Sequence, residues 1–405
     1  MQFEVDLEAA VAALGAGPLT ETGIRVHIAP LFSRVLAANG DRIYLANHSL
    51  GRPLDATSDD VAEGLAAWYA RMGDAWDEWD AEMRAYRLRL GALMGAPRPD
   101  CVVPKTSAGQ GLRAVLNSYD RVANVIATRG EFDSLDVILR EYARRERIAL
   151  TFVEPCAGGD FAADDVLAAI VPGTDLVVTS QVLFQTGQAL PVLPAIIARA
   201  HATGARMLLD IYHSLGVFPV DLAALDVDFA VGGSYKYLRG GPGACFLYVA
   251  PRHLDAGLRT LDTGWFAKEA PFDYARPDPP RYAAGGDGWL ESTPPVLPFY
   301  QARAGQLFTA ALSVARLRAY SLALQLRLVA LLGERGIAAW GGTEERGAFV
   351  VVRQRMARDW SAALLARGVV TDARGEWLRL CPDVLTTDAE LLTAATRLGE
   401  IARSR

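Results

Sequence analysis

The feature that most constrains the fold is an alternation of short apolar runs and helix-like stretches between residues 101 and 249. The predicted strands share the apolar character of buried strands and cover residues 122–127, 149–153, 176–179, 206–209, 229–231 and 245–249. The predicted helices fall between them, at 111–119, 134–145, 164–170 and 193–202. Strands that alternate with helices indicate an α/β fold, with a mostly parallel sheet covered on both faces. Ligands of such sheets bind in loops at the carboxyl ends of the strands.

The rest of the chain divides into three expected regions. We expect an irregular N-terminal segment over residues 1–50, a large domain over 51–290 and a small C-terminal α+β domain over 291–405. Helices are predicted over about 59–93 and about 301–333. A stretch rich in Pro and Gly, at 270–298, is typical of a long loop and favours a domain boundary there.

Composition excludes several classes of protein. The chain is 51% hydrophobic and 22% charged, as expected of a globular protein and not of a disordered or collagen-like chain. Its net charge of −6 argues against a nucleic-acid partner, which would need a basic patch. No apolar run is long enough for a membrane span, and the first residues do not resemble a signal peptide, so we expect a cytoplasmic protein. The scattered cysteines contain no C-x-x-C pair and indicate reduced thiols, at Cys101, Cys156, Cys245 and Cys381.

Two residues that follow neighbouring predicted strands are candidates for holding a cofactor. Asp210 comes directly after the apolar run 206–209, and Lys236 follows the run 229–231 with Gly and Ser beside it. A lysine amine can condense with the aldehyde of pyridoxal phosphate, and a carboxylate can keep the pyridine nitrogen protonated. Taken alone, the two residues favour another interpretation, a solvated lysine and an aspartate that caps a helix.

The residues around this pair resemble the kynureninase family, in the aminotransferase class-V branch of fold-type I pyridoxal-phosphate enzymes. Asp210 and His213 match the family's D-x-x-H, and residues 234–243 match S/T-Y-K-Y-L-N-G/A-G-x-G, with Arg239 in place of Asn. The resemblance implies a mostly parallel sheet of seven strands with a small C-terminal α+β domain. It also implies pyridoxal 5'-phosphate as the cofactor and a homodimer whose active sites use residues of both subunits.

The resemblance extends the candidate cofactor site along the chain. It implies that Lys236 holds the cofactor and moves the α-proton, that Asp210 pairs with the ring nitrogen, and that Phe132 stacks on the ring. The other candidates for cofactor binding are His213, Tyr235, Ser180, Ser107, Ala108, Gly109, Trp265 and Thr293. The N–H groups at the start of the helix after Ser107 suit a phosphate, although a plain helix cap is the alternative there.

Three further residues are candidates for substrate binding: Arg379, Ser49 and Ser292. Arg379 falls on the arginine of the family's I-R-V-A-P, which binds the substrate carboxylate, and a guanidinium fork suits a carboxylate. Ser49 lies in a stretch that resembles G-N-S-L-G near the substrate. Ser292 lies in a segment that reaches the partner subunit's site in the family. No cluster of His, Cys, Asp or Glu has the spacing of metal ligands, so no metal is expected.

The sequence departs from the family pattern where the substrate is recognised. The family's F-P-x-D reads F-D-S-L at 132–135, so its aspartate is missing unless Asp133 or Asp136 replaces it. Residues 181–185 read Q-V-L-F-Q, with apolar or neutral side chains such as Leu183 and Phe184 where relatives often have polar ones. We expect hydrolytic C–C cleavage of an L-α-amino acid with release of alanine, on a substrate that need not be kynurenine. Transamination and β-elimination at a C–S bond on the same cofactor remain alternatives. Lys236 and Asp210 argue against a non-catalytic scaffold.

Overall fold

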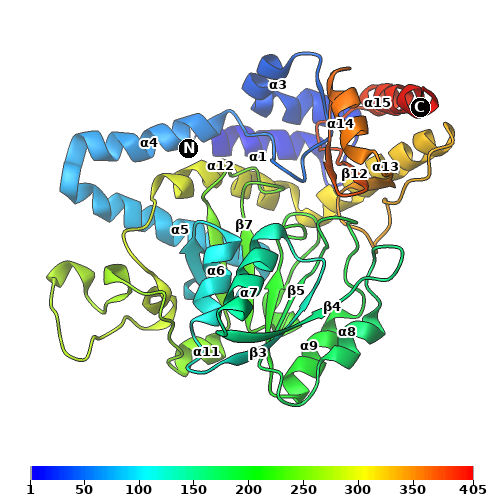
Figure 1. Ribbon diagram of the computed structural model, residues 1–405. Helices are drawn as coiled ribbons and strands as arrows, with labels where there is room; N and C mark the ends of the chain where they lie inside the picture. The colour runs from blue at the N-terminus through cyan, green and yellow to red at the C-terminus, as the bar shows by residue number, and fades with distance from the viewer. Residues whose placement is uncertain (1, 405) are drawn as a thin grey trace.

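A seven-stranded sheet forms the centre of the computed structural model, which describes residues 2–404 (Figure 1). Its strands, in spatial order, are β2 (Val102–Lys105), β8 (Cys245–Val249), β7 (Phe229–Gly233), β6 (Arg206–Asp210), β5 (Leu176–Ser180), β3 (Ala123–Thr128) and β4 (Ile148–Val153). Strand β8 is antiparallel to both of its neighbours, and all other pairs are parallel. The predicted sheet is therefore confirmed, and each predicted strand overlaps an observed one.

Strand β2 is the strand of this sheet that the sequence did not reveal. It has four residues and contains Pro104, and a proline within a run argues against a central strand. The structure places β2 at the edge of the sheet, paired only with β8, with Pro104 opposite Phe246. At an edge, the missing N–H of a proline costs little, which explains why the strand tolerates it.

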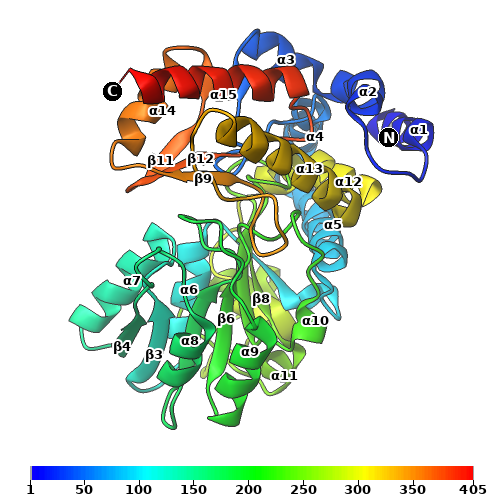
Figure 2. The ribbon, with the colours of Figure 1, turned by 90° about the vertical axis from the view of Figure 1, so that its right-hand side faces the viewer.

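Helices cover both faces of the sheet (Figures 1 and 2). Helices α6 (Ala108–Leu116) and α7 (Asp133–Arg144) pack together, and α8 (Ala163–Ala169) and α9 (Leu193–Ala202) pack together on the other face. Local signals fix their ends: the Ser107 side chain accepts a hydrogen bond from the N–H of Gln110 at the start of α6. Right-handed crossovers between parallel strands place each helix on its face.

The N-terminal segment was predicted to be irregular, and this prediction is wrong. It contains α1 (Gln2–Leu14), α2 (Glu21–Gly23), a π-helical turn (Ile24–Ile28), a 3-10 turn (Ala29–Phe32), α3 (Ser33–Asn39) and the short strand β1 (Ile43–Tyr44). Leu7, Ile28 and Phe32 are buried in one apolar cluster with Phe308 and Leu312 of a distant helix. Such short helices gain their stability from tertiary packing and not from local propensity, which is why the local sequence did not reveal them.

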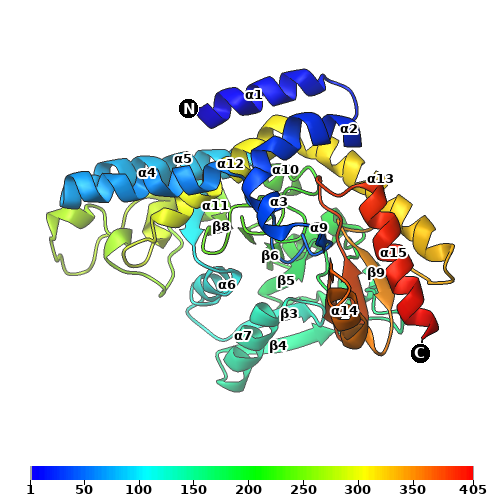
Figure 3. The same ribbon diagram turned by 90° about the horizontal axis from the view of Figure 1, so that it is seen from above.

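Two predicted long helices are each broken once. The first consists of α4 (Ala56–Arg71) and α5 (Trp76–Met94) around a 3-10 turn, and the second of α12 (Leu297–Leu312) and α13 (Val314–Gly333) around Ser313. Figure 3 shows α4, α5 and α12 side by side across the top of the molecule. Among the described residues no single helix is long and apolar enough to cross a membrane. Of these residues, only α12 and α13 taken together, with a bend of 84° between them, reach that length and apolar composition.

The C-terminal part has its own apolar core and lies above the sheet in Figure 2. It contains β9 (Val350–Arg353), α14 (Ala357–Leu365), β10 (Val369–Val370), β11 (Asp372–Arg374), β12 (Trp377–Leu380) and α15 (Asp388–Arg403). Strand β1 pairs with β10, so a piece of the N-terminal segment joins this part of the fold. The short helices α10 (Leu222–Leu225) and α11 (Pro251–Asp255) flank β7 and β8. The domain boundaries at 50/51 and 290/291 stay a prediction.

Candidate active site

The carboxyl ends of four neighbouring strands meet around one cavity. Asp210 is the last residue of β6 and Ser180 the last of β5, while the loops after β7 and β3 bring in Lys236 and Phe132. Because β7, β6, β5 and β3 are neighbours in the sheet, side chains from four separate sequence segments lie together on one wall of the cavity. The other lining residues are Thr106, Ser107, Ala108, Ser134, Phe184, Tyr212, His213, Tyr235, Pro242, Gly243 and Cys245.

Lys236 is buried at the centre of this cavity, with 5% of its surface exposed. Its Nζ lies 2.7 Å from Nε2 of His213 and 5.5 Å from the ring centres of both Phe132 and Tyr212. Burial lowers the pKa of the Lys236 ammonium, and the nearby Asp210 carboxylate opposes the shift. A larger share of the amine is therefore neutral near pH 7, the form that attacks an aldehyde.

Asp210 is the acidic partner of Lys236 in the cavity, with 4% of its surface exposed. Burial raises its pKa, while the N–H of Tyr212, 2.8 Å from Oδ1, and the charge of Lys236 lower it. That N–H is the one hydrogen-bond donor to the carboxylate within residues 2–404. The carboxylate therefore retains acceptor capacity for a protonated ring nitrogen.

His213 contacts the lysine amine. The structure joins its Nδ1 to the Tyr237 hydroxyl at 3.3 Å and its Nε2 to Lys236. Burial, together with the charges of Lys236 and Arg379, lowers the pKa of His213 well below its usual value. A neutral imidazole can accept a hydrogen bond from the lysine amine through Nε2, so the contact can orient that amine.

The predicted phosphate end of the site forms at the start of α6. Thr106, Ser107 and Ala108 line the cavity, and the first turn of a helix leaves N–H groups without acceptors in the helix. Gly109 does not line it: a Cβ built there would come 2.8 Å from Cδ1 of Ile138 on α7. Its lack of a side chain therefore serves the contact between α6 and α7, and only its backbone remains available to a phosphate.

Aromatic rings form the sides of the cavity. The Phe132 ring meets that of Phe184 edge to face at 5.4 Å, and Tyr235 lies beside Tyr212 at 5.5 Å. Tyr212 was not predicted, although it stands between the two motif residues Asp210 and His213. Its hydroxyl donates to Sγ of Cys245 at 2.9 Å, so the ring is fixed against the end of the antiparallel strand β8. The signal that could have revealed it is its place in the D-x-x-H motif.

Arg379 is joined to an internal carboxylate that the sequence analysis did not single out. Its Nε lies 2.7 Å from Oδ1 of Asp372 and its Nη2 lies 2.5 Å from Oδ2, while Nη1 donates to the carbonyl of Phe184. Ser49 and His48 also bind Asp372, each at 2.8 Å. Burial raises the pKa of Asp372, but His48 and Arg379 outweigh this effect and hold that pKa well below its usual range.

This arrangement limits which N–H groups of Arg379 could bind a substrate carboxylate, and the predicted role of Arg379 stays a prediction. A guanidinium has five N–H groups, and three of them are used by Asp372 and Phe184. Two N–H groups therefore remain without an acceptor in the described chain. A substrate carboxylate would be bound by this remaining pair, and not by the side of the fork that faces Asp372. Ser49, the other predicted substrate residue in this cluster, is hydrogen-bonded to Asp372 and does not line the Lys236 cavity.

Replacing Arg379 by Lys should lower kcat/KM about 10- to 100-fold for every amino-acid substrate, because a point charge cannot bind two carboxylates in fixed geometry. Steady-state kinetics on several substrates measure the loss. Arg353→Lys is the matched control, since Arg353 lies on the adjacent strand β9 and pairs with the half-exposed Glu376. Equal kcat/KM in the Arg379→Lys variant and the wild type would show that Arg379 does not bind the substrate.

Trp265, Ser292 and Thr293 do not line the Lys236 cavity of their own chain. They lie in the long segment between α11 and α12, which projects to the lower left in Figure 1. Trp265 borders a separate surface groove, and its Nε1 donates to the Thr293 hydroxyl at 3.1 Å. Within one chain, these three predicted residues are therefore apart from the other candidates.

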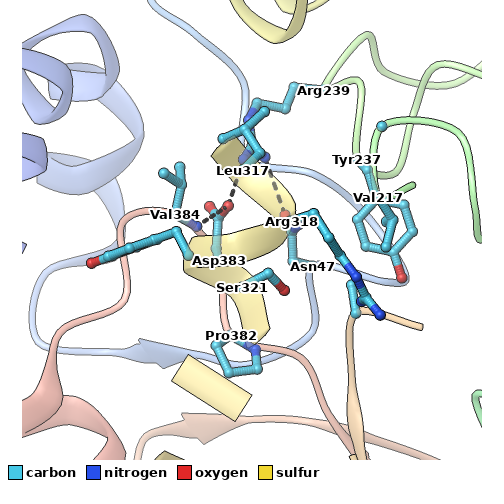
Figure 4. A pocket seen from close by; sticks show the side chains of 13 residues that line it. Asn47, Val217, Tyr237, Arg239, Leu317, Arg318, Ser321, Pro382, Asp383 and Val384 are labelled. Carbon is cyan, nitrogen blue, oxygen red and sulfur yellow. Dashed lines mark hydrogen bonds and ion pairs between the residues drawn. The ribbon is translucent and has the colours of Figure 1, made fainter. Parts of the chain in front are cut away.

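Arg239, which replaces the family's asparagine, forms a buried ion pair. Its Nη2 lies 2.6 Å from Oδ1 of Asp383, and Nε of Arg52 lies 2.9 Å from the other oxygen of that carboxylate. Figure 4 shows Asp383 joined to Arg239 among the residues that line a small pocket. The pair connects the lysine loop to the C-terminal part of the fold.

Neither predicted substitute for the missing aspartate enters the cavity. Asp133 is exposed, and Asp136 pairs with Arg140 and Arg129 and does not line the cavity. The buried acid in this region is Glu131, which accepts a hydrogen bond from the hydroxyl of Ser180 at 2.7 Å. The sequence analysis missed it because Glu131 precedes the family motif.

Comparisons with known proteins identify the family and the fold. A family model described as aminotransferase class-V matches residues 52–376. A kynureninase of Deinococcus radiodurans is 30% identical over 361 residues, which cover 85% of this chain and 84% of that protein. A kynureninase of Pseudomonas fluorescens is 29% identical over 399 residues, which cover 92% of each. The structure of the cystine C–S lyase C-DES with cysteine persulfide superposes with a TM-score of 0.79 at 18% identity, over 90% of this chain and 99% of that one, and confirms the predicted fold class.

Proposed function

This chain belongs to the aminotransferase class-V family, and on that premise we propose that it is a kynureninase-like pyridoxal-phosphate enzyme that cleaves the side chain of an L-α-amino acid. The observation that carries the proposal is the pair of buried residues Lys236 and Asp210, which face one cavity from the ends of adjacent strands. A buried amine and a buried carboxylate without a full set of partners are costly unless a ligand uses them.

The residues of the cavity fit pyridoxal 5'-phosphate. Lys236 and Asp210 would hold it at its aldehyde and its ring nitrogen, Phe132 would lie against the ring, and the start of α6 at Thr106 and Ser107 would bind the phosphate. When bound, the cofactor supplies an electron sink for the substrate's α-carbon. The chain's own residues perform the proton transfer: the neutral Nζ of Lys236 takes the α-proton, and His213 orients that amine.

The substrate wall differs from the sequence-based expectation. Of the three residues Gln181, Leu183 and Phe184, only Phe184 lines the cavity, while Leu183 is buried in the apolar core. An apolar wall discriminates weakly between substrates, by roughly 1–3 kcal/mol per methylene-sized change. We propose that the enzyme releases alanine by hydrolytic C–C cleavage and that its preferred substrate has a less polar side chain than kynurenine.

Steady-state kinetics with L-kynurenine and 3-hydroxykynurenine test this proposal. We expect kcat/KM on both to fall below about 10⁴ M⁻¹s⁻¹, the lower end of the usual enzyme range, with alanine as the amino-acid product. A kcat/KM within that range on either compound would contradict the proposed preference for a less polar side chain and would indicate a kynurenine as the substrate. Release of pyruvate or of a keto acid in place of alanine would instead favour β-elimination or transamination on the same cofactor.

We also propose that the chain acts as a homodimer. In support, Trp265, Ser292 and Thr293 lie outside the cavity of their own chain, on a projecting segment that could complete the site of a second copy. Light scattering and mixing of two inactive variants, one in Lys236 and one in Trp265, would test it: recovery of activity supports shared sites, and its absence in a dimer contradicts them. The cytoplasmic location stays a prediction.

A further inference from the structure

A buried carboxylic acid behind the cavity has no role in the steps above. Glu131, with 3% of its surface exposed, lies in the loop after β3. Its Oε1 accepts hydrogen bonds from the Thr128 hydroxyl at 2.5 Å and from the Ser180 N–H at 3.1 Å. Its Oε2 accepts the Ser180 hydroxyl at 2.7 Å. Glu131 thus faces Ser180, and Ser180 in turn faces the cavity.

The charged groups around Glu131 leave it without a cationic partner within residues 2–404. On its own loop, Arg129 pairs with Glu154 of the segment after β4 and with Asp136 of α7, and Asp136 also pairs with Arg140. The ionisable group that acts on Glu131 from the sheet is Asp210 of β6. Burial raises the pKa of Glu131 to about 7, against the hydrogen bonds from Thr128 and Ser180, and Asp210 adds to the increase.

The protonation state of Glu131 decides where the hydroxyl proton of Ser180 points. A hydroxyl group has one proton and can both donate and accept. When Glu131 is ionised, the Ser180 hydroxyl donates to Oε2, and the oxygen can only accept from the cavity. When Glu131 holds a proton on Oε2, that proton is donated to the Ser180 oxygen, and the Ser180 hydroxyl is free to donate into the cavity.

We propose that Glu131 is a positioning residue that sets, through Ser180, whether the rim of the cofactor site offers a hydrogen-bond acceptor or a donor. The inference rests on the proposed function, because it requires a cofactor held by Lys236. It assigns the acid of this region to Glu131, one residue before the position of Phe132, in place of the aspartate that the family has three residues after it.

The test is a pH titration of the visible absorbance of the Lys236-linked chromophore, which reports the proton on that chromophore and not turnover. An ionised Glu131 stabilises the protonated chromophore, so Glu131→Gln should lower the chromophore's pKa by about one unit. When Glu131→Gln is made in the Ser180→Ala variant, the chromophore's pKa should fall by less than about half of that shift, because the hydroxyl that connects Glu131 to the cavity is gone. Glu131→Asp, which keeps the acid, should restore part of the wild-type value.

Asp136→Asn is the matched control, because this acid lies on the neighbouring helix and is paired outside the cavity. It should leave the titration unchanged. An unshifted titration in Glu131→Gln, or equal shifts with and without the Ser180 hydroxyl, would overturn the inference. If Glu131→Gln fails to hold the chromophore, Ser180→Ala alone decides, since the inference requires a lowered chromophore pKa in that variant as well. A wild-type protein without any chromophore on Lys236 would instead refute the proposed function.

Discussion

Replacing Lys236 by Ala is expected to lower kcat by more than about 10⁴-fold, because one amine both holds the cofactor and transfers the α-proton. No neighbouring side chain can replace the buried amine, because the nearest base, His213, is itself hydrogen-bonded to Tyr237. The variant should keep its fold, because Lys236 lies in the loop after β7, on the cavity wall, and is not part of the apolar core. Single-turnover kinetics and circular dichroism measure the two effects.

Chemical labelling of the lysines tests directly whether Lys236 is the residue that binds the cofactor. The sequence contains three, at positions 105, 236 and 268. Borohydride reduction of the yellow protein should fix the pyridoxyl group on Lys236. Lys105 is already bound to Glu291 at 2.7 Å, and Lys268 borders the outer groove, so Lys268→Ala should leave the labelling of Lys236 unchanged. Peptide mapping that places the label on either of the other two lysines would contradict the site.

Replacing Asp210 by Asn should lower kcat about 10²–10³-fold, the usual cost of removing one preorganised charge from an active site. The amide keeps the shape of the side chain but cannot hold a ring nitrogen protonated, so the electron sink weakens. Asp210→Glu keeps the charge, although one methylene longer, and should retain more activity. The measurements are kcat and cofactor affinity. Wild-type kcat in Asp210→Asn would exclude the pairing with the ring nitrogen.

Much of the site followed from the local sequence because its residues lie directly at strand ends. Asp210 and Ser180 close the apolar runs of β6 and β5, and adjacent parallel strands necessarily bring these ends together. Lys236 and Phe132 follow strands of the same sheet, so their convergence also follows from the alternation of strands and helices. These four residues therefore line one cavity, while Trp265, Ser292 and Thr293 lie outside it. The roles of all of them stay proposals.

Other parts of the fold depended on contacts that no local pattern contains. The helices of the N-terminal segment form because Leu7 and Phe32 are buried against α12, nearly 300 residues later in the chain. Strand β2 forms despite Pro104 because the end of the sheet offers it an edge. In each case tertiary burial outweighs a weak local preference.

By itself, the sequence determined the α/β sheet, the cavity at its carboxyl edge and the pair Lys236 and Asp210, because these depend on strand period and chain order. Only the tertiary structure decided how the polar groups pair. His48 and Asp372 are 324 residues apart, and their contact leaves Arg379 with a partner before any substrate arrives. Glu131, in the loop after β3, likewise reaches Ser180 at the end of the adjacent strand β5. A buried polar group must find a partner, and the folded chain alone determines which partners lie within hydrogen-bond distance.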